Sequence, residues 1–576
     1  MTGPDHEDQP NAARSSAAVS PTAADEGPDS AAAGARQWTG FGFLALALLV
    51  IALDLSVTDV AVPSIVSDLG VSADDASLVV TVYMVVASSF MVLMGKVSDL
   101  VGARKAFLVG AATFAVGSFI TGIAPNFGIL ILGRVIQGLV LAITIPASMS
   151  ILNHEFPSGP SRATAFSVWT AVIGSAMALG PLVGGFLSTY ASWRWAFFIN
   201  VPIMVVAVVG SSMTIRPIAV KLVEKGFDLL GAGLLVIGVA SITFALQEAT
   251  SLGWWSPDRD TILGGAATWD LPVSPVPILL AVGIVLVAGF VYLERVRVRR
   301  GLGVVLELKL FRVPTFTWGT AAAALMTAGV FGLLLMIPLY AQYVLDKDPL
   351  GAGIALAPLG VGMALGGPII SRINVSQRVA VIWTLAVQPI ATLSLVPLIS
   401  ADAATWWLAP ALVVNGFAWG AAYSILVSML LADVPETLSG VAGGTQTSAR
   451  LLAGAIGGAL LTTVLLGSVN LAESGVDESE LTSSERTELE QLYEFSAQVH
   501  PPTTDSGDTV AEKKSDEAFA SAIEQTKDDM ARGIRFAVVG AAVFAAGGYL
   551  CGRRLRHALD EEAAAAETPA GAGKPA

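Results

Sequence analysis

Long apolar blocks are the feature that most constrains how this chain can fold. We count fourteen, beginning near Trp38, Ser77, Lys105, Phe127, Thr164, Trp195, Phe227, Val276, Phe316, Gly351, Val379, Thr405, Gly440 and Ile534. A block of about 20 residues crosses the ~30 Å hydrocarbon core of a bilayer as one α-helix. The segments of about 10 alternating residues that are typical of a membrane β-barrel do not occur. Only 14% of the residues are charged, against about 25% in soluble domains. The sequence therefore predicts an all-α polytopic membrane protein.

The distribution of charge predicts the orientation of the chain. Lys and Arg are concentrated in alternate loops and after the last block, whereas the opposite loops carry Asp with few cations. Because short cytoplasmic loops retain basic residues, an even number of spans places both termini in the cytoplasm. A bias toward Ala and Gly favours a bacterial source, and hence the bacterial plasma membrane. Residues 1–36 and 557–576 are expected to be a disordered leader and a disordered tail.

Residues 468–532 form a long acidic loop on the predicted outer side. It contains the helical-looking piece EAFASAIEQTKDDMARGI. Two interpretations stay open for this loop. It is either a solvated hairpin or an electrostatic vestibule that gathers cations.

Several classes of chemistry are not indicated. The single cysteine, Cys551, excludes an intrachain disulfide and a Cys-based metal cage. No GxxxxGK[ST] phosphate-binding loop occurs, and the four histidines are scattered over loops and tails. We therefore expect no enzymatic activity, no metal and no cofactor. Uphill work would draw on an ion gradient or on another subunit.

Two carboxylates, Asp54 and Asp59, lie in the first apolar block, in the stretch ALLVIALDLSVTDVAVPSI. A charge at mid-membrane costs ~2.5–3.5 kcal/mol on insertion scales, so it normally faces a cavity or a partner. Asp54 lies ~13 Å from the outer end of its span, and Arg134 lies ~10 Å from the outer end of the fourth. The two side chains could therefore meet. We expect Asp54 to carry the proton and Arg134 to be its alternate partner.

Asp59 is rotated by roughly 140° from Asp54 on a helix, so the two acids need not share a pocket. It is either a second titrating or cation-attracting group, or an acid solvated at the cavity mouth.

The segment GKVSDLVGARKAF (residues 95–107) links the second and third spans. Two glycines bracket a tight turn that carries Asp99 among Lys96, Arg104 and Lys105. This pattern suits a switchable ion-pair network. Ordinary basic anchoring on the cytoplasmic side would explain the cations, but not the spacing of Gly and Asp.

This segment resembles the loop signature of the major facilitator superfamily. Further resemblances follow in family order: LGRVIQGLVLA (132–142), AMALGPLVGG (176–185), SWRWAFFINVPI (192–203) and TSARLLAGAIGGAL (447–460). LDLSVTDVAVP (53–63) is similar to the first-span motif of the fourteen-span drug:proton antiporters, which include multidrug and quaternary ammonium exporters of the EmrB/QacA type. Asp59 stands there in place of the usual Asn.

The resemblance implies roles for these motifs. Gly95, Asp99, Gly102, Arg104 and Lys105 would form a latch that stabilises the outward-facing state. Gly180, Pro181, Gly184 and Gly185 would form the antiporter motif of the fifth span. Because the glycines carry no side chains, a neighbouring helix can approach this face of the fifth span closely. Two interpretations of this glycine motif stay open. It forms either a functional bend or seal, or a generic packing surface of small residues.

The second half of the chain has no Asp or Glu in the apolar interiors of spans nine to twelve. Arg450 could shape the cavity field, bind an anionic group or be a structural residue. Candidate cavity residues are Gln137, Trp169, Tyr340, Tyr343, Asn415, Trp419 and Arg450, and Tyr83, Gln342, Tyr423 and Gln446 are further candidates.

The resemblance implies two six-helix bundles, an inserted helix pair and a substrate between the bundles. The expected domains are 37–216, 217–300 with an outer loop, and 301–556. The expected function is proton-coupled efflux of amphipathic compounds, including cationic drugs. The alternatives are an exporter dedicated to one endogenous metabolite, lipid or siderophore, and a receptor or scaffold without flux. Expected partners are small molecules, protons and the bilayer, with no nucleic acid and no obligatory protein partner.

Overall fold

The computed structural model describes residues 28–156, 159–217, 228–257, 261–262, 267–373, 375–401, 403–473 and 510–567. Within these ranges, 14 helical segments are long and apolar enough to cross a membrane. Each of these helical segments begins within about two helical turns of the residue at which the sequence predicts the start of an apolar block. The predicted all-α fold with fourteen spans is confirmed.

The first six spans form the N-terminal bundle. They are α1 (Pro28–Leu69), α2 (Ala73–Val101), α3 (Ala103–Gly122), α4 (Phe127–Glu155), α5 (Pro160–Tyr190) and the pair α6 (Trp195–Phe198) and α7 (Asn200–Thr214). The sixth span is broken at Ile199, so Asn200 is the first residue of α7.

Two inserted spans follow: α8 (Leu229–Gln247) and α10 (Pro275–Arg299). The short helix α9 (Ala249–Leu252) lies between them. A small antiparallel hairpin of β1 (Thr261–Ile262) and β2 (Ala267–Thr268) lies in the same connection. The sequence interpretation did not predict this hairpin.

The last six spans form the C-terminal bundle. They are α11 (Pro314–Leu339), which continues as a π-helical turn (Tyr340–Val344), α12 (Pro349–Ile370), α13 (Gln377–Leu393), α14 (Ala409–Ala432), α15 (Ser439–Glu473) and α17 (Val510–Glu567). Single turns of 3₁₀-helix occupy Leu308–Arg312, Val396–Leu398, Thr405–Leu408 and Glu436–Leu438.

Polar residues fix where several spans begin. The side chain of Ser72 accepts a hydrogen bond from Asp75 N at 3.0 Å, and Asn126 accepts one from Ile129 N at 3.1 Å. Asp348 accepts one from Gly351 N at 2.7 Å. These side chains satisfy backbone donors that the first helical turn leaves free.

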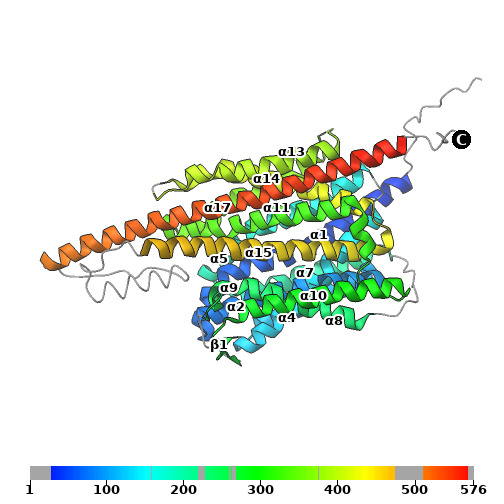
Figure 1. The fold of residues 1–576 in the computed structure, drawn as a ribbon. Coiled ribbons are helices and arrows are strands. Elements are labelled where there is room, and N and C mark those ends of the chain that lie inside the picture. The colour runs from blue at the N-terminus through cyan, green and yellow to red at the C-terminus, as the bar shows by residue number, and fades with distance from the viewer. Residues whose placement is uncertain are drawn as a thin grey trace, which may run out of the picture.

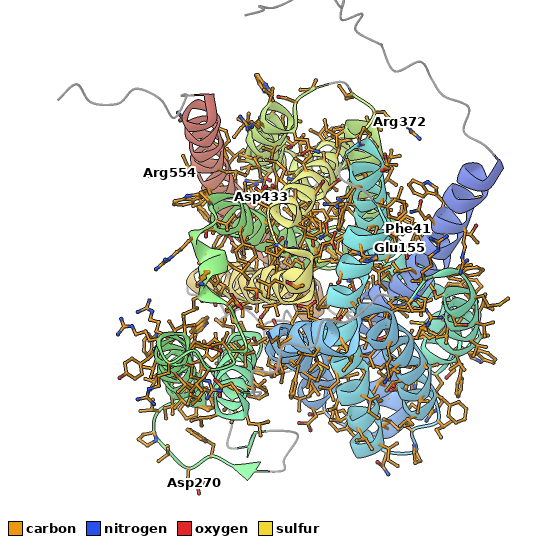
Figure 2. All side chains as sticks on the ribbon, turned by 90° about the vertical axis from the view of Figure 1, so that its right-hand side faces the viewer. Phe41, Glu155, Asp270, Arg372, Asp433 and Arg554 are labelled. Carbon is orange, nitrogen blue, oxygen red and sulfur yellow. The ribbon has the colours of Figure 1, made fainter. Side chains whose placement is uncertain are left out.

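The two bundles lie side by side (Figure 1). The first turns of α1 and the last turns of α17 lie at the same end of the molecule, which we call the termini side; the other end is the far side. Seen from the termini side, the inserted pair stands at one edge, next to both bundles (Figure 2).

Glycines line the seam between the bundles. A side chain at Gly174 of α5 would contact Met363 of α12 at 2.6 Å, and one at Gly444 of α15 would contact Met91 O of α2 at 2.5 Å. Because these positions carry no side chain, the helix backbones approach closely, as small residues allow in membrane helices. The most extensive contacts along the seam are those of two antiparallel pairs, α5 with α12 and α2 with α15.

Three predicted segments are more helical than expected or only partly described. Helix α1 begins at Pro28, inside the predicted leader, and α17 runs to Glu567, inside the predicted tail. Both extensions contain Ala runs, which favour helix. The helical piece predicted near the end of the acidic loop is confirmed as part of α17. The rest of that loop, residues 474–509, lies outside the described residues.

Candidate functional site

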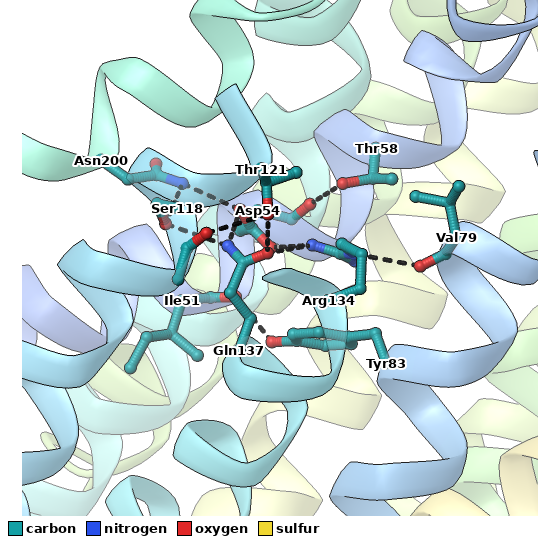
Figure 3. Close-up of polar contacts among 11 residues, drawn as sticks. Ile51, Asp54, Thr58, Val79, Tyr83, Ser118, Thr121, Arg134, Gln137 and Asn200 are labelled. Carbon is teal, nitrogen blue, oxygen red and sulfur yellow. Dashed lines mark hydrogen bonds and ion pairs between the residues drawn. The ribbon is translucent and has the colours of Figure 1, made fainter. Parts of the chain in front are cut away.

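Asp54 of α1 and Arg134 of α4 are in contact inside the N-terminal bundle (Figure 3). Arg134 Nη1 lies 2.5 Å from Asp54 Oδ2, and both side chains are fully buried. The contact that the depth estimate made possible is therefore present. Because the interior is apolar, each charge depends on the other for compensation.

The second carboxylate oxygen of Asp54 is also occupied. Gln137 Nε2 donates to Asp54 Oδ1 at 2.9 Å, and Asn200 Nδ2 donates to the same oxygen at 2.8 Å. Gln137 and Asn200 also donate to Ser118 Oγ, at 2.9 and 3.3 Å. Residues of α4 and α7 thus bind the carboxylate of α1 directly, and Ser118 of α3 holds the two amide side chains in place.

Arg134 is held by more than its ion pair. Its Nε donates to Val79 O at 3.0 Å, and Nη1 donates to Gln137 Oε1 at 3.0 Å. Its guanidinium lies 4.3 Å from the ring centroid of Tyr83, a cation–π contact. Among the described residues, Arg134 Nη2 is buried without an acceptor. The guanidinium thus has contacts that remain when Asp54 is neutral.

This arrangement can exchange a proton for an ion pair. Ionised Asp54 is stabilised by one cation and two amide donors. Protonation of Asp54 would cancel the charge attraction and leave Arg134 in contact with Val79 O, Gln137 Oε1 and the Tyr83 ring. Such a switch links proton binding to the positions of α1 and α4.

Asp59 lies further along α1, toward the far side. Its side chain is outside the described part of the structure, so the two interpretations of this residue stay predictions.

Asp99 contacts the other bundle through backbone amides. Gly440 N donates to its Oδ1 at 2.8 Å and Val441 N donates to its Oδ2 at 2.9 Å, at the start of α15. A carboxylate at a helix N-terminus is favoured by the helix dipole. This contact differs from the expected ion-pair network, because the partners of Asp99 are main-chain donors.

The other residues of the predicted latch surround this contact. A side chain at Gly95 would collide with Gly440 O, so the glycine permits the approach of α2 to α15. Gly102 ends α2 with φ 92°, which favours glycine. Arg104 Nη2 donates to Ser212 O of α7 at 2.6 Å, within its own bundle. Lys105 is exposed.

The predicted antiporter motif lies where α5 meets α1 and α12. A side chain at Gly180 would collide with Ser56 of α1, and one at Gly353 of α12 would contact Pro181 at 3.2 Å. Gly184 is buried, and a side chain at Gly185 would lie 3.8 Å from Leu350 Cα. The motif therefore serves close helix packing on both sides of α5.

Five of the candidate cavity residues gather at the seam, where the side chains of Gln446 and Tyr423 share a hydrogen bond. Trp169 of α5 lies 6.0 Å from Tyr423 of α14, centroid to centroid, and Trp419 lies 5.1 Å from Tyr423. Arg450 of α15 donates to the Tyr423 hydroxyl and stacks 3.8 Å from its ring centroid. We call Trp169, Trp419, Tyr423, Gln446 and Arg450 the seam cluster.

The remaining candidates lie elsewhere. Gln137 belongs to the Asp54 network. Tyr340 donates to Ser400 O at 2.7 Å. Asn415 donates to Thr392 Oγ1 at 2.6 Å inside the C-terminal bundle. Tyr343 is half-buried. The structure does not bring these residues to the seam cluster.

Sequence reasoning missed Asn200 and Ser118 as members of the Asp54 network. Asn200 carried a usable signal, because it is a polar residue at the start of an apolar span and falls on a family motif. Ser118 carried none, since a Ser in a membrane helix is commonplace.

Comparisons with known proteins agree with this architecture. Residues 44–458 match the family model described as Major Facilitator Superfamily. A puromycin resistance protein from Streptomyces alboniger is 32% identical over 77% of this chain and 84% of its own length. The multidrug export protein EmrB from Escherichia coli K12 is 28% identical over 76% of this chain and 81% of its own length. The crystal structure of the human organic anion transporter MFSD10 (TETRAN) has a TM-score of 0.51 and 16% identity, covering 74% of this chain and 93% of that one.

A fold of two six-helix bundles with a buried polar network between spans is that of a secondary transporter. The chain belongs to the major facilitator superfamily, within the drug exporters of the EmrB/QacA type.

Proposed function

We propose that this protein is a proton-driven exporter of amphipathic small molecules, working by alternating access between its two bundles. The bundles would span residues 37–216 and 301–556, with the helix pair of residues 217–300 inserted between them. The observation that carries the proposal is the fully buried Asp54, bound by Arg134, Gln137 and Asn200. Membrane proteins retain a buried acid mainly for a functional reason.

The termini side would face the cytoplasm of a bacterial cell. Basic residues on this side, including Arg372 and Arg554 in Figure 2, fit the preference of short cytoplasmic loops for Lys and Arg. In the described state the bundles are joined on this side by Asp99 with Gly440 and Val441, and by Asn153 Nδ2, which donates to Ser439 Oγ at 2.8 Å. With the termini side in the cytoplasm, the described state would be closed toward the cytoplasm, and the Asp99 contact would act as the latch.

Proton entry would drive the return of the empty transporter. Protonation of Asp54 neutralises its charge and weakens its hold on Arg134, so α1 and α4 can move relative to each other. Release of the proton to the cytoplasm would restore the ion pair. The gradient itself supplies the energy, and no cofactor enters the cycle.

The relatives suggest the class of cargo. One is named for puromycin resistance and one for multidrug export. We expect this protein to move drug-like amphipathic molecules, and puromycin is a sensible first substrate to try.

The test uses purified protein in liposomes with an imposed pH gradient. Uptake of puromycin and of the fluorescent cation ethidium would be followed for the wild type and for Asp54→Asn. The variant keeps the shape of the side chain but cannot ionise, so gradient-driven uptake should fall to the level of empty liposomes. Substrate exchange without a gradient should persist, which shows that the variant is folded.

Asp228→Asn is the matched control. Asp228 is also buried and also pairs with an arginine, Arg297 Nε at 3.1 Å, but it caps α8 by accepting from Gly231 N at 2.9 Å and lies outside the Asp54 network. Asn is also a good cap, so uptake should be retained. Uptake that still follows the pH gradient in Asp54→Asn would refute the assignment of the proton to this residue.

A further inference from the structure

Arg450 is a buried cation without a carboxylate partner. It lies roughly 16 Å along α15 from Ser439, close to the middle of the span. Its residue is 8% exposed. Within the described ranges, no carboxylate oxygen forms an ion pair with it. Arg134, a buried arginine of the N-terminal bundle, has Asp54 beside it.

The contacts of Arg450 are all neutral. Its Nη1 donates to the Tyr423 hydroxyl, and its Nε donates to Thr327 Oγ1 at 3.2 Å. The guanidinium stacks near the rings of Tyr423 and Trp419, at 3.8 and 5.7 Å from their centroids. Hydroxyls and ring faces soften the cost of burying a cation, but they do not cancel its charge.

Two more hydrogen-bond donors nearby have no acceptor. Trp419 Nε1 and Gln446 Nε2 are buried and unpaired among the described residues. An indole N–H can only donate. Leaving a buried donor unpaired is unfavourable. The seam cluster thus combines an uncompensated positive charge with spare donors, which is the complement of an anionic, acceptor-rich group.

Aromatic rings from both bundles flank this charge. Trp169 belongs to α5 and lies roughly 13 Å from the termini-side end of its helix, while Tyr423 lies at a similar distance from that end of α14. Next to them, Ser167 and Ser424 share a hydrogen bond of 2.8 Å across the seam. The cluster therefore lies at mid-membrane where the bundles part, which is where alternating access places a substrate.

We propose that the seam cluster is a subsite for the acidic group of an aromatic substrate, with Arg450 as the anion-binding residue and Trp419 Nε1 as a second donor. The ligand class is a planar aromatic compound bearing a carboxylate or a phenolate. The inference rests on the proposed export function and narrows its cargo: the sequence predicted amphipathic compounds, with cationic drugs among them, whereas this subsite favours anionic ones.

Binding to purified protein in detergent tests the subsite without requiring transport. Three probes share one ring system and differ in charge: anthracene-9-carboxylate, its methyl ester and 9-anthracenylmethylammonium. Dissociation constants would be measured by quenching of tryptophan fluorescence for the wild type and for Arg450→Gln, Arg450→Lys and Trp419→Phe.

The wild type should bind the carboxylate more tightly than the ester or the ammonium compound. Arg450→Gln should weaken binding of the carboxylate by about tenfold to a hundredfold, because a desolvated charge partner is lost. Arg450→Lys should restore part of that loss. Trp419→Phe keeps an aromatic ring, although a smaller one, and loses the N–H donor, so it should weaken carboxylate binding by about threefold to tenfold. Affinity for the ester should stay within about twofold, which also shows that the variants are folded.

Arg535→Gln is the matched control. Arg535 lies in the same bundle, on α17, and donates from Nε to Ile399 O at 2.6 Å, away from the seam cluster. The Arg535→Gln substitution removes one positive charge and should leave the affinities for all three probes unchanged. Equal weakening of all three probes by Arg450→Gln, or an unchanged affinity for the carboxylate, would overturn the subsite.

Failure of the subsite and failure of the export function give different results. If the carboxylate binds in an Arg450-dependent way but no compound is moved by a pH gradient, the subsite stands and the export function fails. If puromycin is transported while Arg450→Gln leaves carboxylate binding unchanged, export stands and the subsite fails.

Discussion

Replacing Asp99 by Asn should shift the balance between the two conformations of the protein. The Asp99 carboxylate accepts from Gly440 N and Val441 N, one donor for each oxygen. An Asn side chain has one acceptor oxygen, and its NH₂ group would face the second backbone N–H. The variant therefore loses one hydrogen bond, weakens the other and removes the charge at the N-terminus of α15.

The size of the effect follows from these contacts. A hydrogen bond to a charged group contributes about 1.5–3 kcal/mol, and a charge at a helix terminus contributes about 0.3–1 kcal/mol. With both contributions lost, the state in which the termini side is closed would be destabilised by about 2–4 kcal/mol relative to the state in which it is open. At about 1.4 kcal/mol for each factor of ten, the ratio of open to closed molecules rises by roughly 30- to 1,000-fold.

Cysteine labelling measures this ratio. The chain has one cysteine, Cys551, so Cys551→Ser gives a background without thiols. Met91→Cys then places a thiol on α2 at a position that is fully buried against α15. The thiol reacts with a maleimide only when the termini side opens. In detergent, adding Asp99→Asn should raise the labelling rate by about tenfold or more, because the rate follows the open population.

Asp433→Asn is the comparison variant. Asp433 also lies on the termini side, but it accepts from Thr315 Oγ1 at 2.7 Å within the C-terminal bundle. It should leave the labelling rate unchanged. The assignment of Asp99 as the contact that closes this side is wrong if the two variants raise the rate equally, or if Asp99→Asn has no effect.

Two further predictions concern stability. Asp68 accepts hydrogen bonds from Arg194 and from Trp193 Nε1, the latter at 3.2 Å. The Arg194 contact holds the pKa of the Asp68 carboxyl below its ordinary value. Because the folded-state pKa is lowered, the stabilisation is present at neutral pH and is lost on acidification. Asp68→Asn should therefore lower the free energy of unfolding at pH 7 by about 0–1 kcal/mol for a half-exposed pair, and Tm with it. The difference from the wild type should shrink below about pH 4, and a difference that grows on acidification would contradict this. Gly180→Ala should lower Tm, since the new methyl collides with Ser56 and overpacking costs about 1–3 kcal/mol. Gly289→Ala, which meets open space, should leave Tm unchanged or raise it, and equal Tm values for the two variants would contradict the close packing of α5 on α1.

Features that depend on local sequence were predictable. The fourteen spans follow from hydropathy alone, because a helix in lipid satisfies its own backbone hydrogen bonds. The meeting of Asp54 and Arg134 was also accessible, since residue counts along two spans give their depths. Helix rise is regular enough for that arithmetic.

Partners that are far apart in sequence were not predictable. The amides bound by Asp99 lie 341 and 342 residues away, and no local pattern indicates which helix end a loop carboxylate will contact. The same holds for Trp169 and Tyr423, which meet only because two bundles pack at one particular rotation. Hydropathy indicates how deep in the membrane each residue of a span lies, whereas the rotation of each helix about its axis depends on its packing against all of its neighbours.

The inserted helix pair touches both halves of the molecule. On the N-terminal side, Thr81 Oγ1 of α2 donates to Glu248 Oε1, just after α8, at 2.6 Å, and on the C-terminal side Trp254 Nε1 donates to Thr463 Oγ1 of α15 at 2.7 Å. The inserted pair thus connects α2 of the N-terminal bundle to α15 of the C-terminal bundle near the far side. Movement that separates α2 from α15 at this end would break one of these two hydrogen bonds unless the inserted pair changes shape with it.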